Sequence, residues 1–445
     1  MQHLLTIYRE HAPANWTKNR YYEGNIPVST VNLGIALPLN FSGLEIGCAW
    51  GAKCVDVLAA RSMFDGFVGV SGGAVEELDR LVINNRLVAE YMKACRDELK
   101  YGCTFATLSA DKALGCKIRF HSPMTAAAVW DGDKGRIAYG MAIMDTAPEN
   151  NTVDWTPSVI RLDLEDEIVV FRRFGSDWGY ERFYHKMKRP LMEPLVWNAT
   201  SAKPFGRSRI KFPIRQLINS YVRTVANATL GLEFSTAPQK YLLGVTDQQF
   251  DALINKKFQQ YVGNIIAATT NPETGEKPSF GQLPQGSITP HVEMLKLLAC
   301  QFGAATGLTV TDTGVISDAN PTSSDAILAQ SQTLVAMAEQ LNVENGDALR
   351  SIALMALAIT HNTTMENLSD EEKDVVAHFK NPAMPSVAVT ADAAIKIASV
   401  RQAFAQTDTF LEMIGFDKAD IRRIKSQETM VRGQAVLDDL GIGLA

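Results

Sequence analysis

The segment LEIGCAWG, residues 44–51, is the stretch whose residue types and spacing are most typical of cofactor chemistry. Its glycines predict a tight turn between a strand and a helix, where the backbone can approach a nucleotide closely. About 20 residues later such a fold ends its second strand on a carboxylate that holds the ribose hydroxyls. Ser71 stands near that place, and a hydroxyl cannot supply the paired acceptors of a carboxylate.

The segment 44–51 looks like the first motif of S-adenosylmethionine-dependent methyltransferases, which is the enzyme alternative for this chain. Pro38 interrupts the strand expected before it, and no regular strand–helix alternation follows. The other interpretation is a helix start with small residues that allow close packing. Gly47, Gly51 and Lys53 also lack the spacing of a phosphate-binding loop.

No other group of reactive side chains assembles in the sequence. The seven histidines are scattered, and the six cysteines form neither a C-x-x-C pair nor a zinc pattern, which predicts reduced, mostly buried thiols. DLEDE, residues 163–167, could bind a cation or form a solvated turn. We therefore expect no catalytic residues, no metal and no cofactor, and a protein that is not an enzyme.

The charge balance argues against a simple DNA-binding module. The 445 residues carry a formal net charge of −6, whereas each phosphate that a protein neutralises needs a lysine or arginine. Two basic clusters stand out: Arg182, Lys186, Lys188 and Arg189, then Arg207, Arg209, Lys211 and Arg215. They could contact phosphates, and the acidic total favours pairing with acidic faces of neighbouring subunits.

A long polar segment, GLTVTDTGVISDANPTSSDAI at 307–327, lies between two segments that are predicted to be helical. Its charged residues are all aspartates, and serine, threonine, asparagine and glycine fill much of the rest. Composition alone indicates a surface connection. A loop of this kind has no group suited to catalysis.

Hydrophobic periodicity predicts the elements around that segment. Helical spacing is expected in much of the first hundred residues, with a break at Asn85, and short strand-forming runs at 102–200 predict antiparallel β structure with a hairpin turn at DGDKG. An apolar stripe starting near Pro213 predicts a helix. Gly231 either marks the end of this helix, kinks it, or lowers its stability relative to alanine. Further helices are predicted at 289–306, 323–362 and 391–438, the first of them with Thr289 as N-cap and Pro290 at its first position.

Several segments together resemble the portal proteins of tailed bacteriophages, especially long-tailed phages of Gram-positive hosts. The resemblance covers about residues 20 to 360 and depends on the order and spacing of the segments. They are YYEGNIP (21–27), AWGAKCVDVLAARSMFDGF (49–67), PFGRSRIKFPIRQLINSYVRT (204–224), APQKYLLGV (237–245), and SITPHVEMLKLLACQFGAATGL (287–308) followed by ISDANPTSSDAI (316–327).

The resemblance implies an α+β, multidomain portal fold with a mixed α/β wing, a two-helix stem, a small α/β clip and a helical crown. The implied bounds are 1–207 for the first part of the wing, 208–236 and 288–307 for the stem helices, 237–287 for the clip, 308–325 for the tunnel loop, 326–384 for the second part of the wing with its long helix, and 385–445 for the crown. The crown is assigned by position, since the sequence beyond about 365 shows little that matches.

The resemblance also implies the residues that contact partners. A DNA-channel tunnel loop would present Asp312, Ser317, Asp318, Asn320, Thr322, Ser323 and Asp325. Docking of the packaging motor would use clip residues Gln239, Lys240, Tyr241, Glu273 and Lys277. Carboxylates in a ring repel phosphates, so DNA would pass without being held.

A portal implies a homo-dodecamer at one capsid vertex, through which double-stranded DNA is packaged and ejected. The implied partners are the major capsid protein, a scaffolding protein, the terminase and a head-completion adaptor. The N-terminal sequence has no signal-peptide pattern and no apolar stretch approaches membrane-spanning length, so no membrane contact is expected. The expected location is the virion, after assembly in the host cytoplasm.

Overall fold

The computed structural model describes residues 1–27, 45–69, 76–148, 155–236, 240–243, 275, 279–282, 287–309, 311–314, 324–383, 387–416 and 418–439. The chain divides into two compact units, Met1–Lys380 and Asn381–Ala445. Helices and strands are both abundant and largely separate along the sequence, so the predicted α+β, multidomain fold class is confirmed.

The N-terminal part of the first unit is mostly helical. Its elements are α1 Gln2–Glu23, β1 Asn25–Pro27, β2 Glu45–Gly47, α2 Trp50–Ala59, β3 Phe64–Gly69, α3 Glu76–Asn84 and α4 Leu87–Tyr101. The predicted break at Asn85 separates α3 from α4. The Asn85 amide donates to the Leu81 and Cys116 carbonyls and accepts from the Ile118 N–H at 2.9 Å, so it bonds strand backbone where a helix would continue.

Antiparallel strands follow, as predicted for 102–200. They are β4 Cys103–Asp111, β5 Gly115–His121, β6 Ala126–Asp131, β7 Arg136–Pro148, β8 Trp155–Asp163, β9 Glu167–Phe174, β10 Asp177–Tyr184 and β11 Met192–Val196. One sheet has the order β10-β9-β8-β7-β6 and another β11-β4-β5. Asp131 pairs with Arg136 across the predicted DGDKG hairpin, which confirms it.

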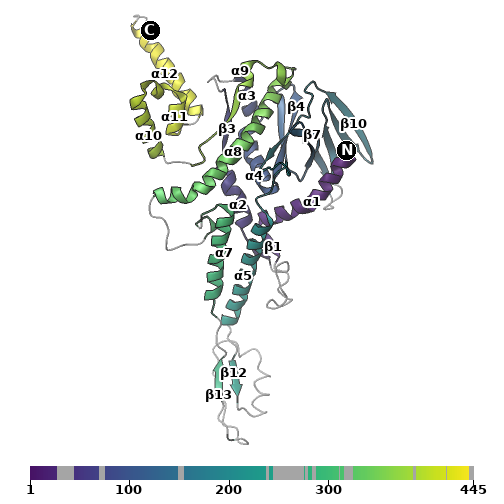
Figure 1. The fold of residues 1–445 in the computed structure, drawn as a ribbon, viewed down its shortest axis with the longest axis vertical. Helices are drawn as coiled ribbons and strands as arrows, with labels where there is room; N and C mark the ends of the chain where they lie inside the picture. Colours follow the sequence, from purple (N-terminus) through teal and green to yellow (C-terminus); the bar gives the residue numbers. More distant parts are fainter. Residues whose placement is uncertain are drawn as a thin grey trace. The chain divides into compact units, whose positions relative to one another are not determined.

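Two long helices, α5 Phe212–Thr236 and α7 Thr289–Thr306, pack against each other in antiparallel directions (Figure 1). Helix α7 has Ile288 rather than the predicted Thr289 as its N-cap, and Gly307 ends it in the left-handed conformation at φ 74°. Helix α5 continues through Gly231, so this glycine does not end the helix. A glycine there is tolerated because the helix is stabilised by packing elsewhere along its length.

A short antiparallel pair connects the far ends of these two helices. Strand β12 is Lys240–Leu243 and β13 is Ser279–Gln282, with Lys240 opposite Gln282. Only residues 237–239 separate β12 from the end of α5, and only residues 283–288 separate β13 from α7. Chain connectivity therefore holds the pair beyond the α5–α7 hairpin, on the side away from the sheets (Figure 1).

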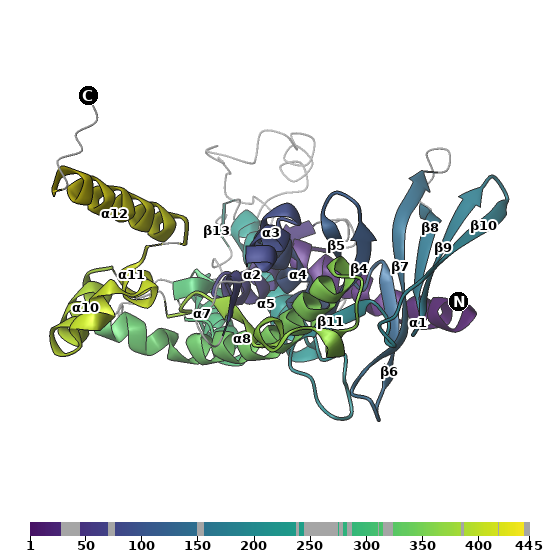
Figure 2. The same cartoon turned by 90° about the horizontal axis from the view of Figure 1, so that it is seen from above.

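The longest helix, α8 Ser324–Thr360, has 37 residues, which corresponds to about 55 Å. It contacts α2, α3, β4, β5 and β11, and Figure 2 shows it running across the first unit. The 3₁₀ turn η4 Met365–Asn367, the short helix α9 Asp370–Lys373 and strand β14 Val375–Phe379 follow, and β14 pairs with β3. The helix predicted at 323–362 is confirmed as α8, and the predicted wing segment 326–384 also contains strand β14 after this helix.

The main core of the first unit joins α2, α4, α5, α7, α8 and the β4–β5 sheet around Trp50, Leu58, Tyr91, Phe302 and Leu349. A smaller cluster lies where α1 covers part of the five-stranded sheet. The second unit contains α10 Val387–Val400, the 3₁₀ turn η5 Gln402–Gln406, α11 Asp408–Ile414 and α12 Lys418–Asp439. It is helical in its described part and starts at Asn381, four residues before the predicted boundary.

Candidate functional site

The polar segment between α7 and α8 starts as an anchored turn. Leu308 is buried and the 3₁₀ turn η3, Thr311–Thr313, lies against α2. The Trp50 indole N–H donates to the Thr313 carbonyl at 3.3 Å, and its ring stacks on Phe302 with centroids 4.6 Å apart. The first part of the predicted loop 308–325 is therefore packed structure, because an indole from α2 fixes it.

Asp312 stabilises that turn. Its carboxylate accepts from the Thr309 N–H at 3.0 Å and from the Thr309 hydroxyl at 2.7 Å. The side chain is half-buried, and its carboxylate is engaged within the turn. The prediction treated Asp312 as an ordinary loop carboxylate, because sequence does not show which aspartate accepts from its own backbone.

The other predicted loop residues are only partly covered by the structure. Asp325 belongs to the first turn of α8, which starts at Ser324, so assigning it to the loop was wrong. The remaining predicted loop residues lie outside the described part of the chain: Ser317, Asp318, Asn320, Thr322 and Ser323.

The predicted docking residues fall around the β12–β13 pair. Lys240 and Tyr241 belong to β12, opposite Gln282 and Gly281. Gln239, Glu273 and Lys277 lie outside the described residues. The structure therefore places two of the five docking residues on a strand pair at the end of the α5–α7 hairpin.

Arg209 fixes the other end of that hairpin. The side chain is buried, and its guanidinium donates to the carbonyl of Cys54 in α2 and, at 2.7 Å, to the carbonyl of Thr306 in the last turn of α7. Burial lowers the pKa of this arginine, and the negative end of the α7 dipole compensates part of the cost of burying its charge. Arg209 thus ties α2 and α7 to the residues that lead into α5.

Each basic cluster has members that are used inside the chain, whereas pairing of the others with neighbouring subunits stays a prediction. Arg189 pairs with Glu193 and donates to the Ser351 hydroxyl of α8 at 3.2 Å. Arg182 lies 3.7 Å from Glu167. A basic run in sequence does not show which members turn inward, since that depends on the backbone direction at each position.

Buried polar groups connect α4 to the middle of α8. Glu98, fully buried, accepts from the Asn345 amide at 2.8 Å, and the same amide lies 3.0 Å from the Tyr91 hydroxyl. Burial raises the pKa of Glu98 well above its ordinary value, since no cation compensates the charged form. Sequence analysis missed this group, although Tyr91, Cys95 and Glu98 lie at i, i+4 and i+7 on one apolar stripe, which was the available signal.

The acidic turn DLEDE joins β8 to β9, and only part of it is solvated. Asp163 is fully buried and pairs with Arg161 at 2.6 Å, whereas Glu165 is exposed and lies 3.1 Å from Lys134. Because each of these two carboxylates already faces a cation, the turn is explained by ion pairs within the chain.

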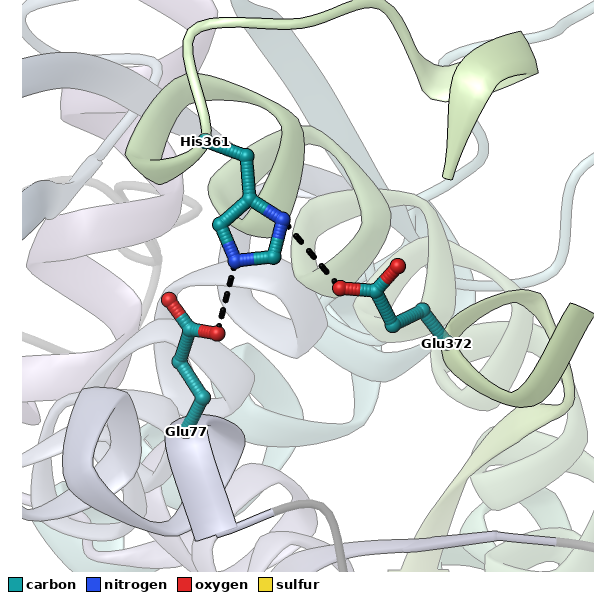
Figure 3. A group of neighbouring side chains, drawn as sticks. All are labelled: Glu77, His361 and Glu372. Atoms are coloured by element: carbon teal, nitrogen blue, oxygen red, sulfur yellow. Dashed lines mark hydrogen bonds and ion pairs between the residues drawn. The ribbon is translucent and has the colours of Figure 1, made fainter. Parts of the chain in front are cut away.

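Glu77, His361 and Glu372 form the group of potential metal ligands in the described part of the chain (Figure 3). The His361 Nε2 lies 2.8 Å from Glu77, and its Nδ1 lies 3.2 Å from Glu372. Both nitrogens can donate only in the imidazolium form, and one cation could take only one of them. The arrangement brings His361, at the end of α8, within hydrogen-bond distance of carboxylates on α3 and α9.

The cysteines are free thiols, and five of the six are buried, as predicted. Burial raises the pKa of Cys48 to about 11 and those of Cys54, Cys103 and Cys116 to about 12. Thiols with such pKa values carry little thiolate at neutral pH. His121, whose Nε2 lies 2.9 Å from the Thr107 hydroxyl, has its pKa lowered by burial to about 4, so it is neutral at pH 7 and has a structural contact.

Gly51 serves close packing, which agrees with one of the two interpretations of segment 44–51. Strand β2 pairs with β1 in antiparallel register, and every strand pair in the described part of the chain is antiparallel. A Cβ on Gly51 would lie 1.9 Å from the Tyr21 carbonyl oxygen of α1. The parallel sheet that the methyltransferase alternative requires is not formed by these strands, and nothing in them supports it.

No protein-family model and no curated protein sequence matches this chain. A solved structure described as the neck of an empty GTA (gene transfer agent) particle computed with C6 symmetry is similar, with 12% identity and a TM-score of 0.48, over 81% of this chain and 88% of that chain. A second, described as the neck of a native GTA particle computed with C12 symmetry, has 12% identity and a TM-score of 0.46, over 82% and 89% of the two chains. Among the described helices, none combines the length and the apolar character needed to cross a membrane.

Proposed function

We propose that this chain is a phage portal subunit: a non-enzymatic member of a ring that conducts DNA, receives the packaging motor and joins head to tail. The observation that carries the proposal is the α5–α7 hairpin. It is fixed at one end by Trp50 and Arg209, continues into the β12–β13 pair at the other, and is followed by a polar segment and the long helix α8. This order agrees with the stem, clip, tunnel loop and wing helix implied by the sequence resemblance.

In this proposal α5 and α7 are the stem, the segment containing β12 and β13 is the clip, and the second unit is the crown. The sheets, α1 to α4 and α8 form the wing. Because η3 is anchored and α8 starts at Ser324, we assign the DNA-facing part of the loop to residues 315–323. This range retains Asp318 and the predicted serine, threonine and asparagine residues. Asp312 belongs to η3 before it, and Asp325 belongs to α8 after it.

In a symmetric ring, one carboxylate in each loop would be enough to repel the phosphates of DNA. Each subunit contributes one Asp318, and a symmetric ring repeats that charge around the channel, so the field repels phosphates from all sides. Hydroxyl and amide side chains contact the backbone of DNA weakly. The clip would dock the terminase during packaging and the head-completion adaptor afterwards, and the wing would face capsid and scaffolding proteins.

The mass of the purified protein, measured by mass photometry with negative-stain images of the same sample, tests this function. We expect rings of about twelve chains of 48.8 kDa around an open hole. A protein that stays monomeric or dimeric, both alone and when co-expressed with its own scaffolding and capsid proteins, would contradict the proposal. Closed assemblies without a hole would favour a plain scaffold.

A further inference from the structure

A cavity of about 860 Å³ lies between the five-stranded sheet, the β4–β5 sheet and the end of α8. This volume is within the ordinary range for ligand sites. Its walls are largely apolar and include Ile168 and Val170 of β9, Phe183 of β10, Met187, and Ile359 of α8. None of these groups contributes to the stem, the clip or the polar loop.

The charged groups that line the cavity are mostly cations. Arg119 of β5, Arg172 of β9 and Lys186 after β10 are exposed, and none has an ion-pair partner in the described part of the chain. Arg161 also lines the cavity and is paired with Asp163. Asp145 is the carboxylate among the lining residues. A basic cavity in a chain of net charge −6 requires an explanation, and the ion pairs among the described residues do not include Arg119, Arg172 or Lys186.

His185 adds a buried ring donor with incomplete hydrogen bonding among the lining residues. Its Nδ1 accepts from the Met187 N–H at 3.4 Å, which leaves the proton on Nε2. That Nε2 atom is buried and makes no hydrogen bond of normal geometry in the described part of the chain, although the Leu164 backbone interacts with the ring. A buried donor without an acceptor is costly, so an acceptor brought by a ligand would be favourable.

Strand β10 forms the open side of this region. It is the terminal strand of its sheet, and it pairs with β9 alone among the described strands. Tyr180 is 62% exposed, Tyr184 is 76% exposed, and Trp178 and Phe183 are also exposed. Edge strands of this length that present aromatic residues are ready templates for another strand, and most proteins cover or charge them.

We propose that β10 and the adjacent cavity bind an extended, acidic segment of a partner protein. The segment would add to the free edge of β10, so that alternate side chains point towards the cavity. Its carboxylates would face Arg119, Arg172 and Lys186, and its apolar residues would contact Phe183 and Ile168. A DNA duplex is the less suitable occupant, because it is too broad to enter the cavity and has no use for apolar walls or a free strand edge.

Fluorescence anisotropy with a short labelled peptide that alternates glutamate and valine tests this proposal on the full chain. We expect saturable binding that weakens as salt concentration rises. Arg172→Glu and Lys186→Glu should each reduce affinity by about tenfold or more. The matched control is Lys53→Glu, an exposed residue of α2 outside the cavity, which should leave affinity unchanged.

Hydrogen exchange of the same complex locates the peptide. We expect protection of residues 177–184, the β10 edge. Unchanged affinity in both charge-reversal variants, equal binding of a lysine–valine peptide, or binding without protection of β10 would each overturn the proposal. Displacement of the peptide by a DNA oligonucleotide of lower concentration would overturn it in favour of a nucleic-acid site. Ring assembly is not needed for any of these readouts, so they are independent of the proposed portal function.

Discussion

At the scale of single residues, this protein buries ionisable side chains where helices meet. Arg209 is buried without a carboxylate partner and relies on backbone carbonyls. Glu98 is buried without a cation and relies on an amide. Both groups lie in contacts that fix α7 and α8, the helices that flank the polar segment. Their substitution therefore tests whether those helices need polar anchors in addition to apolar packing.

Glu98→Gln should make thermal stability less dependent on pH. The raised pKa means that folded Glu98 keeps a proton which the unfolded chain releases above its ordinary value of 4.5. Its contribution to stability is thus fully present below pH 4.5 and is lost as pH rises towards the raised pKa. Relative to the wild type, the variant should gain about 2–4 °C in melting temperature between pH 5 and pH 8.

Tyr91 and Cys95, whose pKa values are also raised, stay neutral over that pH range and should not contribute. Glu90→Gln on the same helix is the matched control, since Glu90 pairs with Lys93 at the surface. A pH dependence that is the same in Glu98→Gln and Glu90→Gln would show that Glu98 is ionised in the folded protein.

Arg209→Lys should weaken the attachment of the last turn of α7. A lysine keeps the charge but lacks the planar guanidinium that donates to the Cys54 and Thr306 carbonyls together. We therefore expect the free energy of unfolding to fall by about 2–3 kcal/mol. Hydrogen exchange should become faster in the last turn of α7. Arg207→Lys, at an exposed position two residues earlier, should change neither quantity. Equal changes in stability and in hydrogen exchange at both positions would contradict the inference that Arg209 holds α7 in place.

At the scale of elements, close approach explains the glycine-rich start of α2. Gly51 lies where α2 meets the end of α1, and Gly47 lies in β2 with no atom within 4 Å of a Cβ placed there. The two glycines belong to one motif in sequence and differ completely in surroundings. Their comparison separates packing from any role in binding a cofactor.

Gly51→Ala should destabilise the first unit by about 2 kcal/mol or more, because the added methyl group overlaps the Tyr21 carbonyl and backbone must move. Gly47→Ala should be within about 0.5 kcal/mol of the wild type. Chemical denaturation followed by tryptophan fluorescence measures both, since Trp50 is adjacent. A neutral Gly51→Ala variant would contradict the helix packing described here.

At the scale of the whole molecule, the proposed ring changes what a single charge does. Asp318 is repeated by symmetry in the proposed channel, whereas Asp312 is occupied with Thr309 in each subunit. A lysine at 318 would reverse the sign of a whole ring of charges. A change at 312 would first disturb the turn that anchors the segment.

Asp318→Lys should therefore lower the amount of DNA packaged per particle while rings still form, because a basic ring holds phosphates. Asp312→Asn, which retains an acceptor for Thr309, should package DNA normally. Asp312→Lys should package poorly, because it disrupts the turn that anchors the segment. Packaging assays combined with mass photometry of each variant measure both effects. Normal packaging by Asp318→Lys would count against an acidic, DNA-facing loop.

The sequence by itself determined the local elements of this protein. Apolar period fixed the stripe of α5, the antiparallel run at 102–200 and the DGDKG hairpin, because these patterns act through neighbours along the chain. The break at Asn85 and the stop at Gly307 were predictable for the same reason: each depends on the conformational preference of one residue type.

Only the tertiary structure decided what the polar residues do. Arg209 and Lys186 look equivalent in sequence, yet one is buried between α2 and α7 and the other is exposed at a cavity. Asp312 and Asp318 look like members of one loop, yet Asp312 stabilises a packed turn. The physical reason is that burial and pairing depend on contacts between residues far apart in sequence, and local pattern does not specify which faces meet.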